Sequence, residues 1–148
     1  MPSGDNLVQI DPHIMNSILI IAHAPLASAL RSAALHAFPE AAARVAVIDV
    51  PPTQSPEVTL GMARALLHTT AQGLGVTGTL VMSDVFGATP CNVAKQLVTQ
   101  HSELGHVQCV AGTSLPMLLR AITYWDEPLA VMAEKALLGA SLGAVAVT

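Results

Sequence analysis

A histidine and an aspartate that could act together each stand at the end of a predicted buried strand. His23 ends an unbroken apolar run that begins at residue 17, and Asp84 follows the short run 79–83. In a parallel sheet the carboxyl ends of neighbouring strands meet at one edge, where ligands bind, so the two side chains are expected to lie together. A carboxylate that accepts one ring N–H fixes the histidine tautomer and leaves the other nitrogen free to act as base or nucleophile. The plainer alternative is a strand-end histidine hydrogen-bonded to a loop carbonyl.

A turn with helix-start signals comes after the aspartate. Gly87 and Ala88 lead into Thr89 and Pro90, and a threonine followed by proline is typical of a helix N-cap and first helical position. The free amides and the positive end of the helix dipole favour phosphate. Ordinary capping would use the same residues, so this signal gains its weight from His23. We predict a phosphate site at Gly87, Ala88 and Thr89.

A second segment is either core or an exposed docking edge. It comprises Ser114, Leu115, Pro116 and Met117, after the strand 107–111. Its expected place beside the same crevice leads us to predict that it contacts a partner.

The remaining polar residues are weaker candidates for a functional site. Asp49, at the end of the strand 45–50, is expected to be a turn residue, and Cys91 a small core residue rather than a reactive thiol. No pair among the other histidines has the spacing of three or four residues that shares a helix face; these are His13, His36, His68, His101 and His106. We therefore predict neither a metal site nor a cofactor.

The elements that must position these residues alternate between strand and helix. Beside the strands already given, the pattern predicts helices over 26–38, 56–71, 91–101, 116–124 and 128–138, the last one capped by Asp126, and a final strand over 143–147. Such alternation with short loops predicts an α/β fold. We expect a flavodoxin-like, doubly wound sheet of order 2-1-3-4, mostly parallel, with helices on both faces.

Composition limits the function classes. With 148 residues, 52% of them hydrophobic and only 11% charged, we expect one domain over 17–148, a flexible lead-in over 1–16, and an oligomer that hides apolar surface. Six Lys and Arg within a net charge of −4 form no basic stripe for nucleic acid. The longest clean apolar stretch, 136–147, is shorter than the roughly 20 residues of a membrane span. Two cysteines and no signal-type N-terminus favour the cytoplasm.

Three ordered segments give the chain a family resemblance. With residues 20–27, 82–94 and 110–118, the sequence resembles the mannose-type enzyme IIA of the bacterial phosphoenolpyruvate-dependent sugar phosphotransferase system (PTS), over about residues 17–147. The departures are small: Ala24 replaces a usual glycine, Ala88-Thr89 a Gly-Ser pair, and Ser114 an asparagine.

The resemblance implies a phosphotransferase component in the cytoplasm. His23 would accept a phosphoryl group from the carrier HPr and pass it to a IIB domain, which we expect on another chain. Asp84 would hydrogen-bond the imidazole, and Thr89 would help to hold phosphoryl oxygens. The family's fold is a flavodoxin-like homodimer in which a last antiparallel strand, here 143–147, is exchanged between subunits.

Three alternatives would give the site around His23 a different function. A stand-alone regulatory module would bind partners according to the state of His23. A phosphatase or mutase would surround the phosphate with arginines, but no arginine is expected beside His23. A flavin module would need a Ser/Thr/Gly-rich cradle, which residues 22–27 lack.

Overall fold

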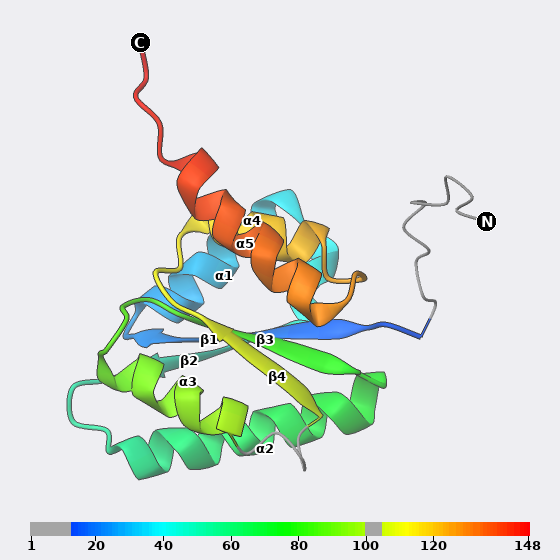
Figure 1. The fold of residues 1–148 in the computed structure, drawn as a ribbon. Coiled ribbons are helices and arrows are strands. Elements are labelled where there is room, and N and C mark those ends of the chain that lie inside the picture. Colours follow the sequence, from blue (N-terminus) through cyan, green and yellow to red (C-terminus); the bar gives the residue numbers. More distant parts are fainter. Residues whose placement is uncertain (1–12, 100–104) are drawn as a thin grey trace.

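Four parallel strands form one sheet, in the order β2-β1-β3-β4 (Figure 1). The computed structural model describes residues 13–99 and 105–148. The strands are β1 (Asn16–His23), β2 (Val45–Val50), β3 (Gly78–Ser83) and β4 (His106–Val110). The central β1 and β3 are buried almost throughout, which explains their continuous apolar runs. The predicted order 2-1-3-4 is confirmed.

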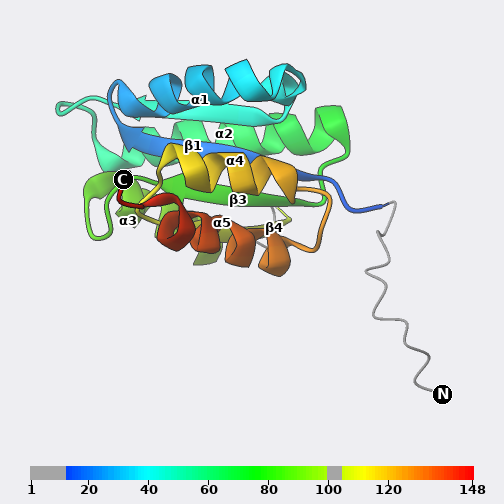
Figure 2. The same cartoon turned by 90° about the horizontal axis from the view of Figure 1, so that it is seen from above.

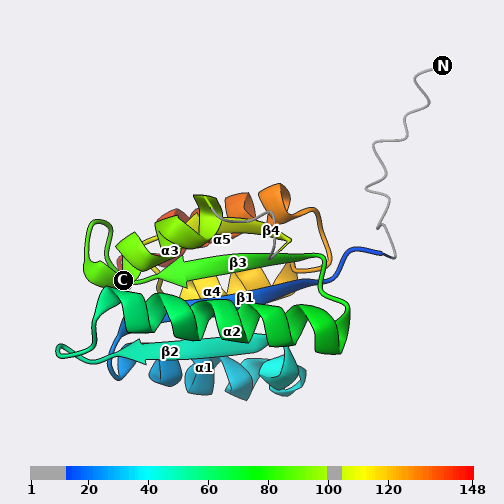
Figure 3. The ribbon, with the colours of Figure 1, turned by 90° about the horizontal axis from the view of Figure 1, so that it is seen from below.

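Helices cover both faces of the sheet. Figure 2 shows α1, α4 and α5 over one face, with α4 in the middle, and Figure 3 shows α2 and α3 under the other. Their bounds, with a short 3₁₀ helix η1, are α1 (Leu26–Ala37), η1 (Pro39–Ala43), α2 (Pro56–Leu74), α3 (Thr89–Thr99), α4 (Leu115–Thr123) and α5 (Leu129–Gly143). The two layers bury separate apolar clusters, because alternate side chains of each strand point to opposite faces.

At two of the predicted helix starts, a serine side chain caps the helix by accepting a hydrogen bond from the backbone N–H three residues later. Ser55 accepts a hydrogen bond from the N–H of Val58 at 3.2 Å, and Ser114 accepts one from Met117 at 3.4 Å. The cap predicted for α5 is wrong. Asp126 instead pairs with Arg44 at 3.0 Å, and α5 begins after Pro128 with no side-chain cap.

Helix α5 lies close against the start of α4 because two of its residues have no side chain. A Cβ at Gly139 would meet the Pro116 carbonyl oxygen at 3.0 Å and the Met117 Cα at 3.1 Å. At Gly143 it would meet the Pro116 ring at 2.5 Å. The glycines thus fix how α5 seats on α4.

The predicted terminal strand is absent from the described part of the chain. Gly143 is the last residue of α5, and residues 144–148 leave the fold without regular structure, with Val147 97% exposed (Figure 1). The Ala- and Leu-rich sequence stays helical to Gly143, and a strand needs a neighbouring strand to satisfy its backbone groups. No such neighbour lies beside the tail within residues 13–99 and 105–148 of this chain.

The start of the chain is shifted slightly from expectation. Asn16 already belongs to β1, whereas residues 1–12 of the predicted lead-in, like residues 100–104 with His101, lie outside the described ranges. Within those ranges no helix is both long enough and apolar enough to cross a membrane.

Candidate active site

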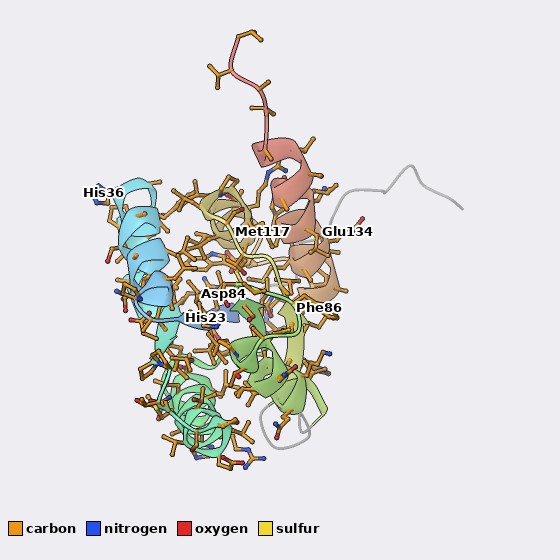
Figure 4. All side chains as sticks on the ribbon, turned by 90° about the vertical axis from the view of Figure 1, so that its left-hand side faces the viewer. His23, His36, Asp84, Phe86, Met117 and Glu134 are labelled. Carbon is orange, nitrogen blue, oxygen red and sulfur yellow. The ribbon has the colours of Figure 1, made fainter. Side chains whose placement is uncertain are left out.

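His23 and Asp84 meet at the carboxyl edge of the sheet. The imidazole Nδ1 lies 2.7 Å from Oδ2 of Asp84, and the same oxygen accepts the backbone N–H of His23 at 3.1 Å. The other carboxylate oxygen accepts the N–H of Val85 at 3.0 Å. Figure 4 looks onto this edge and shows the two side chains together. The pairing predicted from the strand ends is present.

The environment keeps Asp84 ionised. Burial raises the pKa of this carboxyl, but the hydrogen bonds from the side chain and backbone of His23 outweigh burial, so the pKa lies below its ordinary 3.8. An ionised carboxylate only accepts hydrogen bonds, so Nδ1 of His23 must carry the hydrogen between them.

The second nitrogen of the imidazole is therefore the one that is free to act as a nucleophile. With Nδ1 protonated, Nε2 of a neutral imidazole holds the free lone pair. The His23 side chain is 54% exposed while that of Asp84 is 6% exposed. A nucleophile facing solvent, oriented by a sheltered carboxylate, is the arrangement expected for covalent transfer.

Helix α3 begins next to this pair. The prediction made Thr89 the cap residue that precedes the helix, but the helix already begins at Thr89. Thr89 is its first residue, and the carbonyl of Ala88 accepts the first helical hydrogen bond, from Asn92 at 3.0 Å. Ala88, not Thr89, therefore occupies the cap position. Gly87 reaches a φ of 84°, which favours glycine, and so turns the chain into the helix. The exposed Thr89 hydroxyl does not serve as the cap.

A cavity of about 250 Å³ connects His23 with the start of α3. Its lining combines the histidine, the first turn of α3 and the loop after β2: His23, Val50, Pro51, Pro52, Gln54, Thr89 and Pro90. The free amides and dipole of α3 suit an anion there. Gln54 is a wall residue that the sequence did not predict, since nothing in a Pro/Thr/Gln/Ser loop marks which side chain turns inward.

Asp49 has a larger role than a turn residue. It lies in β2, and its carboxylate accepts the backbone N–H of Ser28 at 3.0 Å and the Ser28 hydroxyl. Pro25 at the N-cap of α1 makes no side-chain cap, so Asp49 caps α1 from β2, the strand next to β1. It thereby fixes the segment just after His23. The sequence did hold one signal for this role: the helix that follows Pro25 has no capping side chain of its own.

The predicted docking segment is divided between core and surface. Met117 is fully buried, so its side chain cannot form part of a docking edge, whereas Leu115 is partly buried and packs against the cluster above the sheet. Pro116 is exposed, and Ser114 caps α4. The correction follows from α4 starting at Leu115, which turns its first apolar residues toward the sheet.

No metal centre or reactive thiol emerges in the described residues. Residues 13–99 and 105–148 contain no group of three His, Cys, Asp or Glu that could hold a metal ion. Cys91 is buried in the core, as expected. Burial raises the pKa of Cys109 to about 11, which keeps that thiol protonated.

Comparison with known proteins places the whole arrangement in one family. A sequence model described as "PTS system fructose IIA component" matches residues 17–136. No curated protein matches the chain.

Solved structures of IIA proteins share the fold. The mannose/sorbose specific IIA subunit from Enterococcus faecalis is 21% identical with a TM-score of 0.77, covering 91% of this chain and 96% of that one. The PTS IIA protein associated with the fucose utilization operon of Streptococcus pneumoniae is 20% identical with a TM-score of 0.73, covering 90% and 93%. EIIA from Streptococcus agalactiae is 22% identical with a TM-score of 0.70, covering 89% and 97%.

These structural likenesses, at their low identities, establish the fold alone. The family follows from the sequence model, which runs from the second residue of β1 to about the middle of α5 and so includes His23, Asp84 and the start of α3. The chain belongs to the PTS system fructose IIA component family, the mannose-type enzyme IIA proteins.

Proposed function

We propose that the protein is a cytoplasmic phosphocarrier whose His23 accepts a phosphoryl group from phospho-HPr and passes it to a separate IIB chain. The observation that carries this proposal is the imidazole held by Asp84 at 2.7 Å, with a cavity shared by His23 and the first turn of α3. Family membership supports a phosphotransferase component of a sugar system.

The transfer needs little covalent chemistry from the protein. The P–N bond to the carrier's histidine breaks as Nε2 of His23 bonds to phosphorus, and the carrier's imidazole takes the electron pair of the broken bond. His23 keeps its Nδ1 hydrogen and gains positive charge. In this proposal the Asp84 carboxylate stabilises that charge, while the amides at the start of α3 and the Thr89 hydroxyl donate hydrogen bonds to the phosphoryl oxygens.

The decisive experiment is labelling through the carrier chain. Phosphoenolpyruvate, enzyme I and HPr together should give the protein an acid-labile phosphate. His23→Ala should abolish the label, and His36→Ala, which removes an exposed histidine on α1 far from the site (Figure 4), should retain it. Label that survives His23→Ala would contradict the assignment.

The fate of the phosphate separates transport from regulation. Phosphorylated protein should lose its label when purified IIB chains are added. Retention with every IIB chain, together with partner binding that differs between wild type and His23→Ala, would instead support the regulatory module.

We also infer a homodimer built on the C-terminal tail. In support, β4 is one of the two edge strands of the sheet, the alternating residues 144–148 stand clear of the fold, and α5 exposes apolar side chains, namely Leu137, Leu138 and Leu142. An exposed edge can pair with such a tail from a second copy. Light scattering of a chain ending at Gly143 should show a monomer, and a dimer there would contradict exchange of the tail.

A further inference from the structure

A second cavity lies at the amino edge of the sheet, opposite the edge that carries His23. Its volume is about 430 Å³, against about 250 Å³ for the cavity at His23. The first residue of each of β1, β3, β4 and α5 lines it, and Figure 1 and Figure 2 show that β1, β3 and α5 start on the same side of the molecule. The proposed phosphoryl transfer makes no use of this cavity.

The wall of this second cavity is mostly apolar. Five of the lining residues have hydrocarbon side chains, namely Ile14, Val98, Val107, Pro128 and Leu129. Among the described residues that line the cavity there is no Lys, Arg, Asp or Glu. Pockets of this size and character hold small organic molecules, which a few polar groups orient. The wall therefore favours an uncharged ligand with a largely apolar body.

A buried amide provides the polar contact in this wall. Asn16 is only 2% exposed, and its Nδ2 donates a hydrogen bond to the carbonyl oxygen of Glu127 at 2.7 Å. A carbonyl oxygen only accepts hydrogen bonds, so the amide nitrogen must face Glu127 and Oδ1 must face the other way. Within residues 13–99 and 105–148 no group donates a hydrogen bond to Oδ1. This oxygen is therefore a buried acceptor without a partner.

Gly78 keeps the space in front of that oxygen open. A Cβ at Gly78 would lie 2.8 Å from Oδ1 of Asn16 and 3.3 Å from Cδ2 of Leu129. All three residues line the cavity, so Oδ1 points into it. A buried acceptor without a hydrogen bond destabilises a protein, and a ligand N–H or O–H group beside Gly78 would remove that penalty.

We propose that this cavity binds a small uncharged molecule, of the class of indoles and phenols, whose N–H or O–H group donates a hydrogen bond to Oδ1 of Asn16. The apolar body of the ligand then packs against the hydrocarbon side chains of the wall. Asn16 and His23 are the first and last residues of β1, which places them about 23 Å apart at the usual rise of a strand. The ligand and a phosphoryl group on His23 can therefore be bound together, and the proposal is independent of the phosphocarrier function.

Indole and indene are a matched pair of probes for the hydrogen bond. The two molecules share a skeleton, and indene has a CH₂ group where indole has its N–H. The full-length chain is used, because β4 contributes both to this cavity and to the proposed dimer. In an NMR titration of isotope-labelled protein, indole should cause saturable shifts in the amide signals of Asn16, Gly78 and Leu129. Indene should bind about tenfold more weakly, since it leaves Oδ1 without a donor.

A tryptophan placed in the wall tests the position of the site. Leu129→Trp puts a larger side chain into the cavity and should weaken indole binding about tenfold or more. Leu74→Trp makes the same exchange at an exposed position at the end of α2 and should leave indole binding unchanged.

The wild-type titrations alone can contradict the proposal, whether or not the variants fold. A lack of saturable shifts, or saturable shifts confined to residues away from the cavity, would overturn the site. Equal affinity for indole and indene would overturn the hydrogen bond to Asn16 and with it the proposed class of ligand.

Discussion

A single oxygen of Asp84 binds both the ring and the backbone of His23. Oδ2 lies 2.7 Å from Nδ1 and 3.1 Å from the backbone nitrogen of the same residue. Two contacts from one oxygen fix the imidazole relative to the end of β1, so the direction of Nε2 is set before any partner arrives. In the proposed transfer, preorganisation of this kind would reduce the reorganisation required in the transition state.

Removing the charge of Asp84 should slow transfer while leaving the fold intact. Asp84→Asn keeps an oxygen for the Nδ1 hydrogen but loses the anion that stabilises the charged ring. Hydrogen bonds to charged groups contribute about 1.5–3 kcal/mol, so the rate of His23 phosphorylation should fall about 10- to 100-fold. Asp126→Asn, which alters an exposed carboxylate, should leave the rate unchanged when both are measured by quenched-flow labelling.

The same carboxylate should add a pH-dependent contribution to stability. The pKa of Asp84 is lower in the folded state than its ordinary 3.8, so the folded chain binds fewer protons than the unfolded chain in this range. The contribution is therefore fully present above 3.8 and is lost as the pH falls through the folded-state pKa. Urea unfolding should show wild type more stable than Asp84→Asn at about pH 6, with a smaller difference at about pH 3. A difference that grows toward the lower pH would contradict the lowered pKa.

The fold and the central pair were predictable because local signals and topology agree. Continuous apolar runs at β1 and β3 require a sheet covered on both faces, and right-handed crossovers then make these strands neighbours. The meeting of His23 and Asp84 at one edge of the sheet follows from that strand order alone. Asp49 and Gln54 were missed, because their roles depend on contacts between segments that sequence spacing does not encode.

Two other misses have local causes. Residues 143–147 alternate as a strand would, yet the Ala- and Leu-rich helix before them continues to Gly143, and the tail finds no pairing edge within the described part of its own chain. For Met117, an apolar run after a strand is compatible with either core or docking surface. The Ser114 cap fixes where α4 begins and therefore which way the Met117 side chain points. That direction places Met117 in the core.

The cap that Asp49 provides to α1 should be measurable as stability. Asp49→Ala removes the acceptor for both the amide and the hydroxyl of Ser28. Loss of a helix cap costs about 1 kcal/mol, so the free energy of unfolding in urea should fall by about that amount. Asp49→Asn keeps an acceptor oxygen and should lose less. An equal loss in both variants would show that the charge of Asp49, and not the cap geometry, supports α1.

Two glycines in helix interiors should respond in opposite directions to alanine. Gly139→Ala puts a Cβ against the backbone of α4, and such overpacking costs about 1–3 kcal/mol. At Gly61 in α2 a Cβ meets nothing within 4 Å, so Gly61→Ala should stabilise the protein by about 0.5–1 kcal/mol. Thermal unfolding of the two variants compares the same chemical change at a packed and an open position. Stabilisation by Gly139→Ala would contradict the close packing of α5 on α4.

Thr89 tests whether the start of α3 binds the phosphoryl group. The hydroxyl is exposed beside the cavity and is not the helix cap, so removing it should affect transfer and not folding. Thr89→Val should lower the rate of His23 phosphorylation about tenfold with an unchanged unfolding midpoint, whereas Thr89→Ser should keep the rate. Because valine retains the shape of threonine, a loss confined to this variant isolates the hydroxyl. Equal rates in all three proteins would mean that the backbone amides of α3 hold the oxygens without it.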